Sequence, residues 1–296
     1  MKIRRTDLAV EARELWQEGA GQAARLPGVT AEEGNREGIP VTTVRILDEE
    51  GEKALGKPRG NYVTLTLDGV ARREEDIFGR AARAVAGELS GLLEGVAPDG
   101  LVLVVGLGNR AITPDAIGPK VHERTLVTRH LVRQMPEHFG SFRPVASLAA
   151  EVLGNTGMES GEVARAVCED IRPACVIAVD PLASRSLDRL CRTVQISDTG
   201  IIPGSGVGNH RFALDKKTLG VPVLAVGVPT VVYGATLAAD LLGRDDLPPL
   251  GRGGELLVTP KDIDSQVSDL SKVIAYGINL ALQPGLGVED LDLLLS

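Results

Sequence analysis

The stretch Gly100-Leu101-Val102-Leu103-Val104-Val105-Gly106 is a continuous apolar run between two glycines. Such a run is typical of a strand that is covered on both faces, as in a parallel sheet. Further strands are predicted at residues 175–179, 193–196, 221–226 and 256–258. Helical patterns at residues 119–134, 161–171, 230–242 and 262–282 alternate with them. The alternation predicts an α/β fold of three layers, a mostly parallel sheet with helices on both faces.

The chain before residue 76 has a different pattern. Residues 41–47 and 62–67 alternate between apolar and polar side chains, which predicts two half-buried strands paired antiparallel. A helix is expected from residue 77 to 93. We therefore predict one domain over residues 1–296. Residues 1–75 form an N-terminal extension with an edge β-hairpin, and residues 76–296 form the α/β core.

Composition excludes several classes of protein. The formal net charge is −8, and no basic face of the kind that nucleic-acid binders carry is visible. The three cysteines lack CxxC spacing, which argues against a disulfide framework and a zinc knuckle. No run of about 18 apolar residues predicts a membrane span, and the polar N-terminus does not resemble a secretory signal. We expect a cytoplasmic protein without direct nucleic-acid or membrane partners.

Two aspartates follow predicted buried strands, Asp115 after the first and Asp180 after the second. Ligand sites in open α/β sheets form at the carboxyl ends of the strands, so both side chains are expected at one edge. Two convergent carboxylates can act as base and acid in the hydrolysis of a peptide bond. They could equally hold a divalent metal that activates water. The alternative is structural, since an Asp after a strand often caps a helix or stabilises a turn.

The glycine-rich loops allow more than one interpretation. Residues 106–111 match G-x-G-x-x-A after a strand, but two prolines postpone the helix that a dinucleotide fingerprint requires. Residues 204–208 lack the Lys-Ser/Thr ending of a phosphate-binding loop. Both loops are therefore interpreted as backbone N–H donors near a substrate carbonyl, or as tight turns. Asp198, like the other two aspartates, could be a site residue or could have a structural role in a turn. The residues predicted to line the site are Gly108, Asn109, Asp198, Ser205, Gly206 and Asn209.

Several motifs in this order resemble the germination protease (spore protease) family of endospore-forming bacteria. They include Arg5-Thr6-Asp7-Leu8-Ala9-Val10-Glu11, the stretch from Thr113 to Pro119, the stretch from Ala178 to Arg185, and the run QISDTGIIPGSGVGN at residues 195–209. The matches span nearly the whole chain.

The resemblance implies properties that spacing does not supply. It implies an aspartic-type endopeptidase whose two Asp fall on Asp115 and Asp180, a fold similar to the hydrogenase maturation peptidases, and no obligatory cofactor. It also implies small acid-soluble spore proteins as substrates, a homotetramer, and a location in the forespore or spore core. Family members are zymogens with a pro-segment before the R-T-D-L-A-V-E motif, where this sequence has only residues 1–4. The region 243–254 is also shorter than in the family.

The sequence thus predicts an endopeptidase that initiates degradation of small acid-soluble DNA-protecting spore proteins during germination. The first alternative is a metal-dependent, maturation-type peptidase that acts on a protein partner. The second is a non-enzymatic module that binds a nucleotide or phosphate through the glycine loops.

Overall fold

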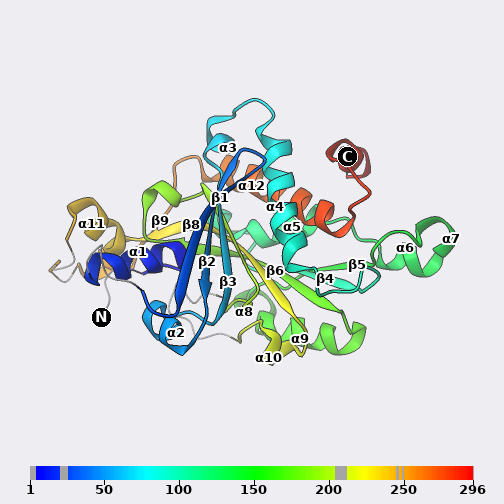
Figure 1. Cartoon of the computed structure of the whole chain (residues 1–296), viewed down its shortest axis with the longest axis horizontal. Coiled ribbons are helices and arrows are strands. Elements are labelled where there is room, and N and C mark those ends of the chain that lie inside the picture. The colour runs from blue at the N-terminus through cyan, green and yellow to red at the C-terminus, as the bar shows by residue number, and fades with distance from the viewer. Residues whose placement is uncertain (1–4, 21–25, 204–211, 245–246, 249, 296) are drawn as a thin grey trace.

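A computed structural model describes residues 5–20, 26–203, 212–244, 247–248 and 250–295. Over these residues the strands form one sheet of nine (Figure 1). The strands are β1 (Val29–Arg36), β2 (Ile39–Ile46), β3 (Gly60–Thr66), β4 (Val102–Gly106), β5 (Val145–Ala149), β6 (Cys175–Ser184), β7 (Thr193–Ser197), β8 (Val223–Tyr233) and β9 (Leu257–Val258). Their order is β1-β2-β3-β7-β8-β6-β4-β5, with β9 paired to β8.

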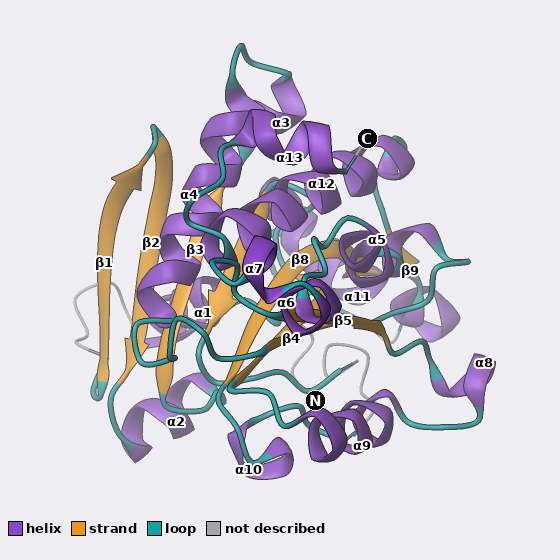
Figure 2. Cartoon of the chain, turned by 90° about the vertical axis from the view of Figure 1, so that its right-hand side faces the viewer, coloured by secondary structure: helices purple, strands orange, loops and turns teal. Residues whose placement is uncertain are grey.

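Helices cover both faces of this sheet (Figure 2). The helices are α1 (Ala9–Ala20), α2 (Glu49–Leu55), α3 (Asp68–Arg72), α4 (Ile77–Leu92), α5 (Ile117–Glu123), α6 (Arg129–Gln134), α7 (Pro136–Phe139), α8 (Leu153–Thr156), α9 (Ser160–Ile171), α10 (Lys216–Leu219), α11 (Gly234–Leu242), α12 (Ile263–Leu282) and α13 (Val288–Leu294). The 3₁₀ turns in the described part of the chain are η1 (Thr113–Asp115), η2 (Leu187–Arg189) and η4 (Gly251–Glu255).

One half of the sheet is parallel and consists of β8, β6, β4 and β5. Its residues alternate between two separate cores. Val104 belongs to the core that includes α4 and α12, while Leu103 belongs to the core with Ala164 and Cys168 of α9. Because both faces of these strands are covered by helices, the predicted α/β class with helices on both faces is confirmed.

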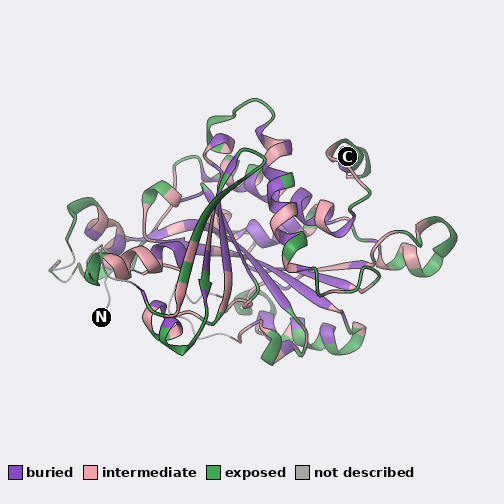
Figure 3. Cartoon of the chain, viewed as in Figure 1, coloured by how far each residue is buried: buried purple, intermediate pink, exposed green. Residues whose placement is uncertain are grey.

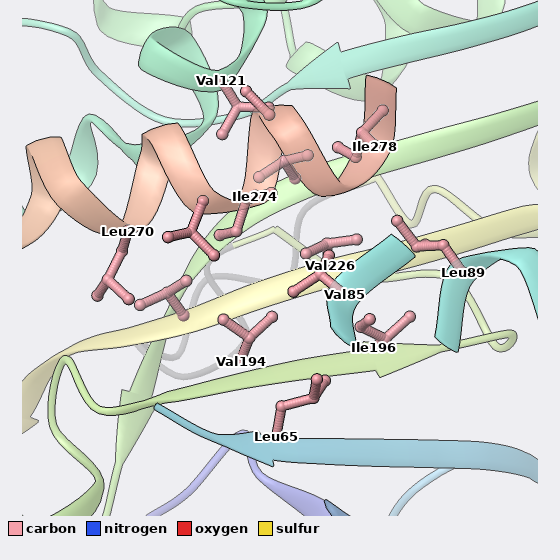
Figure 4. Packing of buried hydrophobic residues seen from close by; sticks show 14 of the residues in the cluster. Leu65, Val85, Leu89, Val121, Val194, Ile196, Val226, Leu270, Ile274 and Ile278 are labelled. Atoms are coloured by element: carbon pink, nitrogen blue, oxygen red, sulfur yellow. The ribbon is translucent and has the colours of Figure 1, made fainter. Parts of the chain in front are cut away.

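The larger core lies between the sheet and the pair α4 and α12 (Figure 4). Val85 and Leu89 of α4 and Ile274 of α12 are completely buried there. Burial of each such side chain contributes about 1.5–3 kcal/mol relative to its exposed state. Gly277 lets the two helices approach closely, since a Cβ there would lie 2.4 Å from a methyl carbon of Val85. This packing supports the parallel half from one face.

The other half of the sheet is antiparallel and holds β1, β2, β3 and β7. The sheet is therefore mixed, and the expectation of a mostly parallel sheet describes only its β8-β6-β4-β5 half. Residues 41–46 and 60–65 pair antiparallel as β2 and β3, as predicted. This pair does not form the edge of the sheet, because β1 lies outside β2, and α2 lies between β2 and β3 in the chain. Figure 3 shows how exposed β1 is beside the buried central strands. Its sequence, VTAEEGNR, has too few apolar residues to reveal a strand.

Two predicted helices differ from the structure. The segment 119–134 is broken into α5 and α6, because the N–H of Leu126 donates to Oδ1 of Asn279 on α12 instead of continuing a helix. The predicted helix at 230–242 begins later, at Gly234, because β8 continues to Tyr233. Within the described residues, none of the helices has the length and apolar character needed to span a bilayer.

Candidate functional site

A pocket of about 230 Å³ lies at the carboxyl end of the parallel strands. It forms where β4 stops at Gly106 while the neighbouring β6 continues to Ser184 and β8 to Tyr233. Asp115 and Asp180 both line it, among mostly apolar side chains that include Ile112 and Leu257. A carboxylate pair in a largely apolar recess is the kind of site in which acid–base chemistry can occur.

A larger cavity of about 460 Å³ lies elsewhere, between α4, α12 and α13. Its lining mixes acidic and basic side chains. Lys272 in its wall already contacts the rings of Phe78 and Tyr276 and lies 3.8 Å from Asp292. In the part of the chain that the structure describes, none of the loops that follow the parallel strands contributes to its lining, so we assign the chemistry to the smaller pocket.

Asp180 is held by the strand β6 itself. The sequence predicted that this strand ends at Val179, but β6 continues through Asp180, which pairs with Gly227 of β8. Gly106, the last residue of β4, is level with Val179. Asp180 is therefore the first residue of β6 beyond the end of β4, and the residue is only 5% exposed.

Asp115 is held by the turn η1 at the end of the glycine loop. Its Oδ2 accepts a hydrogen bond of 2.8 Å from the backbone N–H of Asn109. Gly108 has φ +110°, and a Cβ at this position would lie 2.1 Å from the carbonyl oxygen of Asp115. Only glycine adopts this conformation readily and leaves room for the Asp115 backbone. Gly108 and Asn109 thus determine where the Asp115 carboxylate lies.

The glycine loop contacts protein backbone. A Cβ on Gly118 would lie 2.2 Å from the carbonyl oxygen of Leu107 and 2.6 Å from that of Val179. The start of α5 is therefore packed directly against the ends of β4 and β6. A Cβ on Gly106, the first glycine of the 106–111 pattern, would lie 2.3 Å from the carbonyl oxygen of Gly118, which gives that glycine a structural reason unrelated to a dinucleotide.

A third carboxylate, Asp7, lines the same pocket and was missed as a site residue. Its backbone N–H donates to the carbonyl oxygen of Ala183 at 2.9 Å, and its Oδ2 accepts from the Ala183 N–H at 2.8 Å. A search for polar residues that directly follow predicted strands does not find Asp7, because Asp7 follows no strand. It reaches the pocket from the N-terminal segment. Its membership in the Arg5–Glu11 motif was the available signal.

Buried polar contacts hold that N-terminal segment in place. The completely buried Glu11 accepts hydrogen bonds from the backbone N–H groups of Arg185 (2.7 Å) and Ser186 (3.0 Å). The Lys57 ammonium donates to the backbone carbonyl of Asp7 at 2.7 Å. Burial lowers the pKa of Lys57, while the nearby carboxylates of Asp7 and Glu11 oppose that shift.

The remaining predicted site residues do not all meet at the pocket. Gly108 lines it, and Asn109 contacts it through Asp115. Asp198 does not join them, because β7 runs antiparallel to β8 and ends level with Ala225, toward the opposite edge. The Asp198 carboxylate is exposed and accepts hydrogen bonds from the backbone N–H and the Nδ2 of Asn61. Ser205, Gly206 and Asn209 lie outside the described residues.

Metal and thiol chemistry have little support elsewhere in the described chain. No three His, Cys, Asp or Glu side chains in that part are grouped so that they could hold a metal ion. All three cysteines are buried and unpaired with one another. Burial raises the pKa of the Cys191 thiol to about 12 and those of Cys168 and Cys175 to about 11. These thiols therefore stay protonated at neutral pH.

The fold and the pocket thus describe an α/β protein with aspartates at the carboxyl end of its parallel strands. A family model described as germination protease matches residues 9–244. The germination protease of Caldanaerobacter subterraneus subsp. tengcongensis is 43% identical, covering 98% of both chains. That of Clostridium tetani is 43% identical over 97% of this chain and 98% of its own, and that of Bacillus cereus is 38% identical over 94% and 93%. The chain belongs to the germination protease family and is therefore a peptidase.

Proposed function

We propose that this chain is an aspartic-type endopeptidase that initiates the degradation of small acid-soluble, DNA-protecting spore proteins during germination. The observation that carries the proposal is one pocket lined by both Asp115 and Asp180, in a member of the germination protease family. The pocket volume of about 230 Å³ suits a short extended stretch of a substrate chain rather than a folded domain.

In the proposed reaction a water molecule attacks the carbonyl carbon of the scissile peptide bond. One carboxylate of the pair takes a proton from this water, and the other carboxyl group gives a proton to the amide nitrogen as the C–N bond breaks. The products are a carboxylate and an amine. The backbone N–H of Asn109 and the tight turn at Gly108 support this division of labour by fixing the Asp115 carboxylate before substrate arrives.

The test replaces each carboxylate by its amide. Asp115→Asn and Asp180→Asn should each lower cleavage of a purified acid-soluble spore protein by at least about 100-fold, because an amide cannot exchange the proton. Asp99→Asn, which changes an exposed carboxylate before β4, is the matched control and should cleave normally. Thermal unfolding shows that each variant is folded. Normal cleavage by both site variants would rule out the pair.

The two carboxylates could also bind a divalent metal, as a maturation-type peptidase would require. A chelator series on the purified protein separates the two versions. Cleavage that is lost on chelation and restored by one metal would replace direct activation of water by a metal-held water.

The proposal includes a homotetramer located in the forespore or spore core, with spore proteins as partners and no direct contact with nucleic acid. Support for self-association comes from three exposed leucines near the pocket. Leu241 and Leu242 on α11 and Leu256 after η4 are each more than 60% exposed, and α11 packs against η4. Clustered apolar side chains of this kind are typical of interaction surfaces.

A further inference from the structure

Thr230 occupies an irregular position in β8. The parallel register between β6 and β8 pairs Leu182 with Pro229 and then Ala183 with Val231, so that Thr230 is passed over. This is a β-bulge, in which one strand carries an extra residue. Bulges are frequent next to active sites, where they redirect a side chain. The sequence predicted a helix that begins at residue 230, but β8 continues through Thr230 to Tyr233.

The Thr230 hydroxyl is not used by the fold. Thr230 is completely buried and lines the pocket of Asp115 and Asp180. Its Oγ1 has no hydrogen-bond partner among the described residues. Its backbone carbonyl, by contrast, accepts a hydrogen bond of 2.9 Å from the Thr259 hydroxyl, which secures the bulge. A buried hydroxyl without a partner destabilises the folded state, so a functional reason for it is expected.

Among the described residues that line the pocket, Thr230 carries the one uncharged side-chain donor that the fold does not already use. Among the described lining residues, the hydroxyl groups belong to Ser160 and Thr230. The Ser160 hydroxyl already donates to the carbonyl oxygen of Glu151 at 2.7 Å. The aspartates of the pocket, when ionised, only accept hydrogen bonds. The carbonyl oxygen of a peptide under attack gains negative charge and requires a donor.

We propose that Thr230 is a catalytic residue whose hydroxyl donates a hydrogen bond to the carbonyl oxygen of the scissile peptide bond. This role rests on the proposed peptidase site of Asp115 and Asp180. The hydroxyl stabilises the oxyanion that forms as water adds to the carbonyl carbon, and no proton leaves Thr230. Substrate thus supplies the partner that the folded chain does not.

The experiment compares Thr230→Val, Thr230→Ser and a matched control, Thr64→Val. Thr64 of β3 is also buried with an unpartnered hydroxyl, but it lies in the antiparallel half. Thr230→Val should lower kcat by roughly 100-fold with a small change in KM, as removal of one oxyanion donor does. Thr230→Ser should keep kcat within about fivefold, because it keeps the donor. Both Val variants should unfold at the same temperature as the parent chain or higher.

The substrate for this comparison is a single peptide that the parent chain cleaves, selected from a random peptide library, so that kcat and KM refer to one bond whatever the natural substrate is. Undiminished kcat in Thr230→Val would overturn the proposal. A lowered unfolding temperature in Thr230→Val, with none in Thr64→Val, would also overturn it by showing a structural partner. Retained cleavage in Asp115→Asn and Asp180→Asn would defeat the proposed function instead, and the contrast between the Thr230 and Thr64 variants would still decide the hydroxyl's role.

Discussion

The parallel and antiparallel halves of the sheet differ in what lies at their strand ends. In the parallel half, β4 stops at Gly106 while β6 and β8 continue, and this difference in length leaves a recess that Asp115 and Asp180 line. In the antiparallel half, neighbouring strands are joined in a level register, and β3 pairs with β7 over their whole shared length. The pocket therefore arises because β6 and β8 extend beyond the carboxyl end of β4, whereas the antiparallel strands end nearly level with one another.

Strand direction separates two aspartates that the sequence presents alike. Asp180 and Asp198 both occur near the end of a buried run. β6 is parallel to its neighbours, so Asp180 lies at the pocket. β7 is antiparallel to both β3 and β8, so Asp198 lies toward the other edge and binds Asn61.

The largest expected effect comes from Gly108 in the parallel half. Gly108→Ala forces a Cβ to within 2.1 Å of the Asp115 carbonyl oxygen at φ +110°. We expect a loss of about 2 kcal/mol or more in the free energy of unfolding and a near-complete loss of cleavage. Denaturant unfolding and peptide cleavage measure both.

The matched control lies in the antiparallel half. A methyl group added at Gly34 of β1 would meet no other atom within 4 Å, so Gly34→Ala should change stability by less than about 1 kcal/mol and leave cleavage unchanged. If Gly108→Ala and Gly34→Ala had the same free energy of unfolding and the same cleavage activity, the proposed difference between the two halves of the sheet would be wrong.

A smaller effect is expected at Asp198. Asp198→Ala removes the acceptor for the backbone N–H and Nδ2 of Asn61, at 2.8 and 2.6 Å. The free energy of unfolding should fall by about 1 kcal/mol, while kcat/KM stays within about twofold. Urea denaturation and a cleavage assay test this. A strong loss of activity in a folded Asp198→Ala variant would mean that Asp198 belongs to the active site and does not have a purely structural role.

The smallest effect is expected at His122, which packs α5 against the edge strand β5. Its Nδ1 lies 2.8 Å from Oγ of Ser147. Burial lowers the pKa of His122 below the usual 6.5, while the Glu123 carboxylate opposes this shift and Arg110 adds to it. The unfolded chain therefore takes up a proton near pH 6.5, before the folded chain does. Stability should decline as the pH falls from about 7 through 6.

Thermal unfolding at a series of pH values measures this decline. His122→Gln should flatten the decline, since glutamine does not titrate. A slope that is unchanged in this variant would assign the pH dependence to other groups.

Much of the architecture could be predicted because it repeats locally. The apolar run of β4, the 3.6-residue period of α12 and the alternation in β2 each show in the sequence with boundaries near those observed. β5, with the sequence VASLA, is too short to stand out, and β1 too polar. The break between α5 and α6 depends on Asn279, 153 residues away from the Leu126 N–H that it accepts. The pattern of side chains within one segment does not predict a contact between residues so far apart in the sequence.

By itself, the sequence determined the α/β class, the aspartates that follow buried runs, and the family, because periodicity and motif order are properties of neighbouring residues. Only the tertiary structure decided that β7 runs antiparallel to its neighbours and that Asp7 lines the pocket. It also decided that Thr230, at a bulge in β8, lines the same pocket. Strand direction, register and the arrival of a distant segment depend on which surfaces pack together, and side-chain pattern along one segment does not specify its partner.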